Sequence, residues 1–342
     1  MQRLAGRKVF TAGKRTYTWD DAILAAHVRG AYAELERRVR EGLACAKHLR
    51  TLGEWARDPD VEDEAADAWR YDRNLLAADD LDAWLSERGL DEDDWNDYME
   101  RIVLRAQWSA ELDEITRANR VSAPEVESAL YVEAVCSGAL TEWAEQLAGR
   151  AAVYDRMHGS KKAAPCSKTE IRSVLKRVPR GGAPDPEHVA CLEVVYRGFA
   201  AEAATPAAID REIAGHVLDW TRFDCTTVVF ASEHAAREGA LLVREDGLPL
   251  AEAASMAKAF VQRSRYVLED TDPSLRDRLT AARPGEVIGP LSVDGRYALI
   301  GVGKRVEPSS KHAAVRKRAQ ERVIRRTIQR EVTGRVAWHE RF

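Results

Sequence analysis

The sequence lacks any run of about 18 apolar residues, the length that a membrane-spanning helix needs. Its opening segment, MQRLAGRKVFTAGKRTYTWDDA, also lacks the apolar stretch and small-residue cleavage site of a secretory signal. We therefore expect a cytoplasmic protein that has no membrane partner.

Cysteine is scarce, and the cysteines are spread too widely to suggest a shared site. Their number is odd and no CxxC pair occurs, so we expect neither a disulfide framework nor a thiolate zinc site. We interpret all of them as reduced thiols and small buried side chains. They are Cys45, Cys136, Cys166, Cys191 and Cys225.

The short motifs of several enzyme classes are missing as well. HExxH, GxGxxG, GxSxG and the phosphate-binding GxxxxGK[ST] do not occur, which argues against zinc proteolysis, nucleotide binding and serine hydrolysis. The acidic run 91–94 lacks the spaced ligands and central glycine of a calcium loop, so helix capping explains it better. We expect no cofactor and no metal, and we assign no catalytic residue.

What the sequence does contain is typical of a soluble protein with several domains. It has 342 residues, 45% hydrophobic and 32% charged, which is enough for two or more cores. The 52 Lys and Arg residues nearly balance the 56 Asp and Glu residues, so we expect no nucleic-acid partner. The charge is uneven: residues 58–100 carry 17 acidic residues against three arginines, whereas residues 309–342 carry ten basic residues against three glutamates. These segments either attract each other or form solvated helix faces.

The hydrophobic spacing divides the chain. Residues 1–157 show a helical period almost throughout, which predicts a bundle, and the Gly- and Pro-rich interval 158–187 predicts a linker. Connecting helices are expected over 188–223. Residues 224–307 combine a β-branched run, helices and a strand pair around Asp294-Gly295, which predicts an α+β domain. Residues 308–342 predict a basic helix with one apolar stripe.

Three segments resemble a known family. ARPGEVIGPLSVDGRYALIGVGKRVEP resembles the end of a parvulin-type peptidyl-prolyl isomerase domain, and CTTVVFASEHAAREGALLVREDGLPLAEAA is similar to the first strand and helix of that domain. ADAWRYDRNLLAADDLDAWLSERGLDEDDWNDYMERIVLR resembles the N-terminal chaperone domain of SurA-type foldases, and also its variant in parvulin-related proteins encoded with ribosomally made, modified peptides. The resemblance implies a mostly helical α+β fold: a SurA-like helical bundle, a degenerate parvulin-like domain and a long C-terminal helix that packs on the bundle.

The residues that the family uses for isomerisation are replaced in this chain. The resemblance places Thr227 and Ala298 where the family has two histidines, and Thr271 and Leu275 where it has the methionine and phenylalanine of the proline pocket. Alternation along the two strands adds Val229 and Ile300 to the same face. We expect these six residues to bind an extended peptide, with plain sheet core as the alternative for Thr227, Val229, Ala298 and Ile300.

The resemblance implies a foldase or accessory protein that binds an unfolded or precursor peptide during peptide maturation, with peptide-modifying enzymes as further partners. Two alternatives stay open at this point. One is a peptide-tailoring enzyme on the same fold, for example a cyclase that closes a ring by holding the reacting groups together. The other is an active prolyl isomerase, which lowers the barrier to X-Pro rotation by binding the twisted amide.

Overall fold

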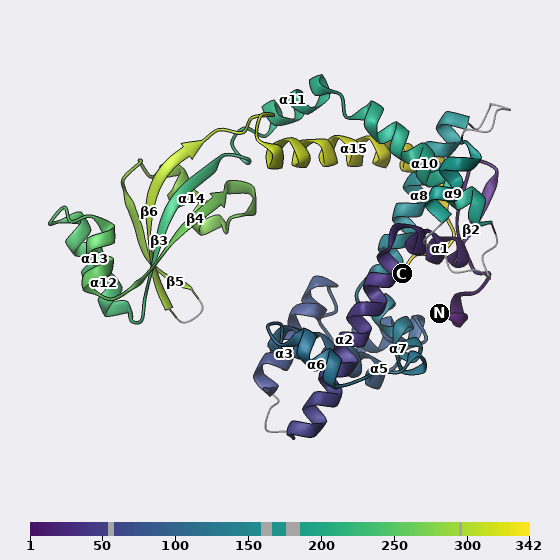
Figure 1. The fold of residues 1–342 in the computed structure, drawn as a ribbon, viewed down its shortest axis with the longest axis horizontal. Coiled ribbons are helices and arrows are strands. Elements are labelled where there is room, and N and C mark those ends of the chain that lie inside the picture. Colours follow the sequence, from purple (N-terminus) through teal and green to yellow (C-terminus); the bar gives the residue numbers. More distant parts are fainter. Residues whose placement is uncertain (54–57, 159–165, 176–184, 294–295) are drawn as a thin grey trace. The chain divides into compact units, whose positions relative to one another are not determined.

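The computed structural model describes residues 1–53, 58–158, 166–175, 185–293 and 296–342. It divides into two compact units (Figure 1). Unit 1 comprises residues 1–200 and 327–342, and unit 2 comprises residues 201–326. Much of the interval expected to be a linker, and the predicted Asp294-Gly295 turn, lie outside the described residues. The predicted fold class, α+β and mostly helical, is confirmed.

Unit 1 is built mainly of helices packed around one large apolar core that holds Trp19, Leu35 and Leu140. Helix starts agree with local sequence: Ser122 and Glu125 form a capping box, in which each side chain satisfies a backbone N–H of the other. The helices are α1 (Trp19–Arg29), α2 (Ala31–Leu52), α3 (Pro59–Asp72), α4 (Ala78–Glu87), α5 (Glu92–Gln107), α6 (Leu112–Ala118), α7 (Ala123–Cys136), α8 (Ala139–His158), α9 (Lys168–Leu175) and α10 (Pro186–Ala203).

The helical period from Trp19 to Leu49 predicts continuous helix, but the structure breaks it at Gly30. This glycine has a φ of 83°, a left-handed conformation that ends α1 and precedes α2. Glycine adopts that conformation without steric cost, whereas most residues do not. The apolar spacing continues across the break because both helices turn a face toward the same core.

Unit 1 also contains a small sheet, which the predicted helical bundle did not include. Its strand order is β2-β1-β7, with β1 (Lys8–Ala12), β2 (Arg15–Thr18) and β7 (Val336–Trp338) all antiparallel. Phe10 stacks on Tyr17 at 4.8 Å between ring centroids and contacts Trp338 at 5.4 Å. Because β7 comes from the other end of the chain, no local sequence pattern reveals this pairing.

Unit 2 centres on a four-stranded antiparallel sheet of order β4-β3-β6-β5. The strands are β3 (Arg222–Phe230), β4 (Phe260–Val267), β5 (Val287–Val293) and β6 (Arg296–Val306). Strand β4 corrects the sequence pattern, which predicts helix as far as Val261. Helix α13 (Leu250–Met256) ends earlier, and Lys258 follows it at a φ of 51°, a left-handed conformation that does not continue a helix.

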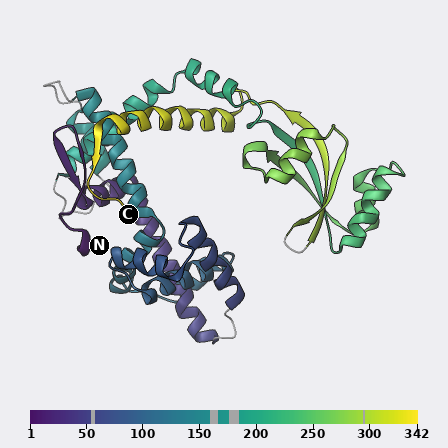
Figure 2. The same cartoon turned by 180° about the vertical axis from the view of Figure 1, so that it is seen from behind.

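Helices cover both faces of this sheet, as the two opposite views show (Figures 1 and 2). Helix α14 (Pro273–Ala281) packs its Leu279 against Cys225 and Ile300 on one face, which we call the covered face. Helices α12 (Glu233–Arg244) and α13 pack Ala240 and Ala254 against Leu299 on the other. A sheet buried on both sides in this way holds its strand register firmly.

The basic helix α15 (Ala313–Arg335) runs through the boundary between the units, and its part in unit 2 makes several ion pairs there. Arg326 pairs with the buried carboxylate of Glu212 on α11 (Pro206–Gly215). Arg322 and Arg318 pair with Glu269 in the short 3-10 helix η3 (Leu268–Asp270). Burial acts to raise the pKa of the Glu269 carboxyl, but hydrogen bonds from Arg322 and Trp220 outweigh it and lower that pKa.

Candidate peptide-binding site

The six residues predicted to bind peptide all belong to unit 2, on the covered face of the sheet or on the segment that packs over it. Thr227 and Val229 lie on β3, and Ala298 and Ile300 lie on β6. Thr271 follows η3, and Leu275 is on α14. Strand pairing places Thr227 opposite Ile300 and Val229 opposite Ala298, so these four side chains form a contiguous block.

Most of that block is buried. The exposed fractions are 5% for Thr227, 4% for Ala298, 2% for Ile300 and 9% for Thr271. Ile300 belongs to the apolar cluster beneath α14. Val229 and Leu275 are half-buried and are the two of the six that offer appreciable surface. Four of the predicted residues are therefore buried beneath the surface of the candidate site and do not line it.

The two threonine hydroxyls already have partners within the protein. The Thr227 hydroxyl lies 3.0 Å from the Tyr266 hydroxyl of β4, and the Thr271 hydroxyl donates to the Val267 carbonyl at 2.7 Å. Ala298 carries no polar side-chain atom. Neither a threonine hydroxyl nor a methyl group titrates near neutral pH, so these positions do not supply a general acid or base.

One row of the covered face runs across all four strands. Across the sheet, Phe260 pairs with Val229, Val229 with Ala298, and Ala298 with Leu291, which gives one apolar residue per strand. We call these four residues the open row. Phe260 is 67% exposed, Val229 and Leu291 are half-buried, and Ala298 is buried between them. Phe260 thus exposes a large apolar side chain at the first position of the edge strand β4.

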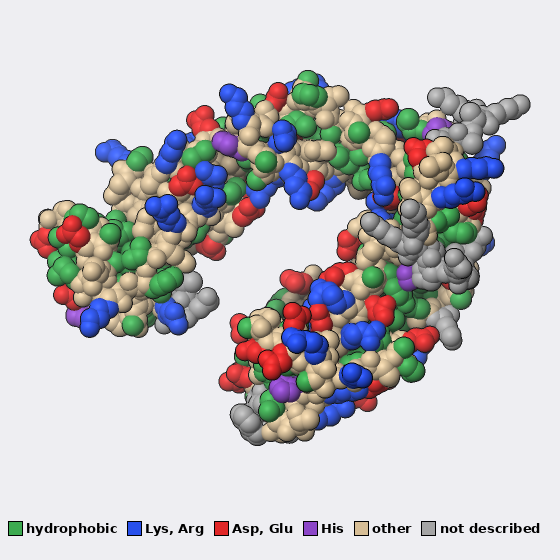
Figure 3. All heavy atoms as spheres, in the orientation of Figure 1, with side chains coloured by type: hydrophobic (Ala, Val, Ile, Leu, Met, Phe, Trp, Pro, Cys, Tyr) green, Lys and Arg blue, Asp and Glu red, His purple; other side chains and the backbone are tan. Residues whose placement is uncertain are grey.

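The sequence pattern missed two members of the open row. The sequence pattern predicts helix at Phe260. Leu291 follows the cis Gly289-Pro290 bond, and the pairing of β5 with β6 is irregular there, so the simple alternation of side chains does not place Leu291 on a face. Further exposed apolar residues of unit 2 are Leu241, Met256 and Val261. In Figure 3, hydrophobic side chains gather over the end of unit 2 that carries α12 and α13.

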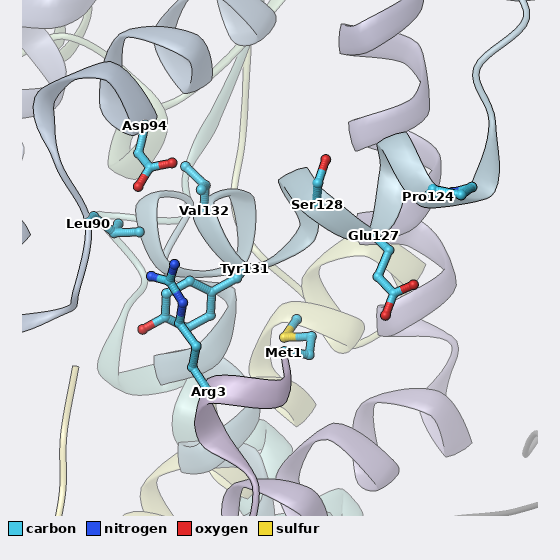
Figure 4. A pocket seen from close by; sticks show the side chains of 9 residues that line it. All are labelled: Met1, Arg3, Leu90, Asp94, Pro124, Glu127, Ser128, Tyr131 and Val132. Atoms are coloured by element: carbon cyan, nitrogen blue, oxygen red, sulfur yellow. The ribbon is translucent and has the colours of Figure 1, made fainter.

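Unit 1 has a separate cavity of about 410 Å³ beside α5 and α7 (Figure 4). The Arg3 guanidinium lies over the Tyr131 ring at 5.5 Å and donates to the Gly89 carbonyl, while the Tyr131 hydroxyl donates to the Arg88 carbonyl at 2.7 Å. The polar groups of Arg3 and Tyr131 in this cavity thus already have partners within the protein. The lining residues are Met1, Arg3, Leu90, Asp94, Pro124, Glu127, Ser128, Tyr131 and Val132.

None of the helices described is long and apolar enough to cross a bilayer. In the described part of the chain, no three His, Cys, Asp or Glu side chains are grouped as metal ligands would be.

No family model matches the sequence, and no curated protein matches it. Among solved structures, PrsA from Bacillus subtilis is similar to this chain. The similarity covers 64% of this chain and 88% of PrsA, with 15% sequence identity and a TM-score of 0.21. A similarity this low carries no argument about function, so the proposal below rests on the site residues and on the resemblance of the sequence motifs.

Proposed function

We propose that this chain is a peptide-binding foldase or accessory protein whose unit 2 holds an extended, unfolded or precursor peptide on the open row. The observation that carries the proposal is the row itself. Four paired strands carry Phe260, Val229, Ala298 and Leu291 side by side, with Phe260 exposed, Val229 and Leu291 half-buried, and Ala298 buried between them.

The dimensions of the row suit a short extended segment. Neighbouring strands lie about 4.8 Å apart, so four strands span roughly 14 Å, the length of about four extended residues. Apolar side chains of the peptide would pack on Phe260 and on the half-buried Val229 and Leu291. Holding a flexible chain costs conformational entropy, so we expect moderate affinity and broad sequence tolerance from these few anchors.

The chemistry of the face favours binding over isomerisation. The resemblance places Thr227 and Ala298 at the family's two histidine positions, and the Thr227 hydroxyl is paired with Tyr266. Without imidazoles there, the face lacks the paired donors that the family uses to stabilise the twisted amide. The client class that the resemblance suggests is the precursor of a ribosomally made, modified peptide, with the modifying enzymes as further partners.

The proposal is tested by measuring how tightly the full chain binds a short fluorescein-labelled peptide of alternating leucine and serine, using fluorescence anisotropy. Phe260→Asp places a charge in the open row, and because Phe260 is 67% exposed the fold should tolerate it. We expect the substitution to weaken binding by about tenfold or more, since losing burial of one aromatic side chain costs roughly 1.5–3 kcal/mol.

Leu218→Asp provides the matched control. Leu218 is 55% exposed in unit 2 and precedes Arg222, where β3 begins, whereas Val229 of the open row is near the other end of that strand. Its substitution adds the same charge to a similarly exposed position and should leave the affinity within about twofold of the unmodified chain. Equal affinity for Phe260→Asp and Leu218→Asp would show that the open row does not bind the peptide.

A further inference from the structure

Two of the cysteines lie against each other. The Sγ atoms of Cys166 and Cys191 are 2.7 Å apart. The other three cysteines belong to different apolar clusters: Cys45 to the one between α2 and α6, Cys136 to the main core of unit 1, and Cys225 to the covered face of unit 2. The spacing in the sequence gave no reason to pair Cys166 with Cys191, since 25 positions separate them.

The two sulfurs come from elements that are each anchored within unit 1. Cys166 immediately precedes Ser167, which accepts a hydrogen bond from the backbone N–H of Glu170 and so caps α9. Helix α9 is fixed by Val174, which is 6% exposed in the main core. Cys191 lies on α10 and is 8% exposed. The contact between the sulfurs is therefore set by two packed helices rather than by the cysteines alone.

We propose that Cys166 and Cys191 are a redox-active pair that closes into a reversible intramolecular disulfide, joining the start of α9 to α10. The oxidant is a small-molecule disulfide of the glutathione class. A disulfide needs its two sulfurs about 2.05 Å apart, so only a small movement converts the observed contact into a bond.

Closure takes two exchange steps. The Cys166 sulfur attacks one sulfur of the oxidised glutathione; the oxidant's S–S bond breaks, a Cys166–glutathione mixed disulfide forms, and one glutathione leaves as its thiol. The Cys191 sulfur then attacks the Cys166 sulfur, forming the protein disulfide and releasing the second glutathione thiol. Both protein thiols are oxidised by two electrons in total, and their protons leave on the two glutathione thiols.

The surroundings fix the order of the two attacks. Cys166 is half-buried and reachable, whereas Cys191 is buried. Burial, followed by the hydrogen bond with Cys166, raises the pKa of the Cys191 thiol to about 12. A thiol with so high a pKa is a poor first nucleophile toward a dissolved oxidant. Cys191 reacts once the mixed disulfide holds the Cys166 sulfur against it.

The test equilibrates the reduced full chain in glutathione buffers of increasing oxidised fraction, alkylates the remaining thiols and records intact mass and linked peptides. We expect the free thiols to fall from five to three without a glutathione adduct, with Cys166 and Cys191 found in one linked peptide pair. Cys191→Ser should instead accumulate the glutathione adduct on Cys166, because the second step is blocked. Cys166→Ser should form neither product.

Cys225→Ala is the matched control, since Cys225 lies in unit 2 and its loss should leave the disappearance of two thiols unchanged. Two results would overturn the proposal. One is an unmodified chain that keeps all five thiols at every buffer ratio, and the other is an adduct in Cys191→Ser that forms on a residue other than Cys166. Neither result would bear on peptide binding by the open row, which is measured on reduced protein.

Discussion

Replacing Arg101 with methionine should lower the free energy of unfolding of unit 1 by about 3–5 kcal/mol. Arg101 on α5 and Glu133 on α7 are both nearly fully buried, at 4% and 2% exposure, and pair at 3.4 Å. Removing the arginine leaves the carboxylate of Glu133 without its partner in a region where charge is expensive. Tryptophan fluorescence during chemical denaturation follows this unit, because Trp220 is the only one of the nine tryptophans that falls within residues 201–326.

The double variant Arg101→Met with Glu133→Leu separates the buried charge from the loss of packing. Replacing both partners by apolar residues is expected to recover most of the lost stability. The exposed pair Arg37–Glu34 serves as a control, since both side chains are more than half exposed and Glu34→Ala, which leaves Arg37 paired with Glu41, should cost less than about 1 kcal/mol. A loss of under about 1 kcal/mol for Arg101→Met, or no recovery in the double variant, would contradict a costly unpaired charge.

The second large effect is expected at Trp69 on α3. Its ring contacts Trp84, Trp95 and Tyr98 at centroid distances of 5.2, 5.7 and 6.4 Å. Its indole N–H donates to the Cys136 carbonyl at 3.0 Å. Trp69→Ala removes the ring at the centre of this aromatic cluster and leaves a cavity, so it should cost about 3–5 kcal/mol of the unfolding free energy of unit 1.

Trp69→Phe is the matched variant for this site. It keeps an aromatic ring against Trp84 and Trp95 but removes the N–H donor, so we expect a smaller loss, roughly 1–2 kcal/mol. Calorimetry or denaturant titration compares the two variants. Equal and small losses for both would mean that the cluster does not hold α3 to α5 and α7.

The helices of unit 1 could be predicted because their information is local. A capping residue such as Ser122 and the spacing of apolar residues act within a few turns. The pairing of β7 with β1 could not be predicted, since these strands are joined through the fold and not through neighbouring sequence, whereas the hairpin of β1 and β2 is local and had Gly13 as its signal. The break at Gly30 was missed because the apolar period continues across it, although the glycine itself was the available signal.

The candidate site could be predicted only in part. Alternation placed Thr227, Val229, Ala298 and Ile300 on one face, and the strand pairing agrees with that placement. Which of them reach the surface depends on how α14 packs on the sheet and on which residues pair across the four strands. The sequence pattern of a single strand specifies neither the packing nor the register. Phe260 and Leu291 belong to the candidate site only because the strand register places them beside Val229 and Ala298.

Whether unit 2 binds an extended peptide on the open row is tested most directly by titrating the full chain, labelled at its isoleucine, leucine and valine methyl groups, with the alternating leucine and serine peptide. The methyl resonances of Val229 and Leu291 in the open row, and of Leu275 beside it, should shift progressively and saturate. Those of Leu90 and Val132, which line the cavity in unit 1, should stay in place. Shifts confined to Leu90 and Val132 would contradict binding at the open row and assign the peptide to the cavity of unit 1.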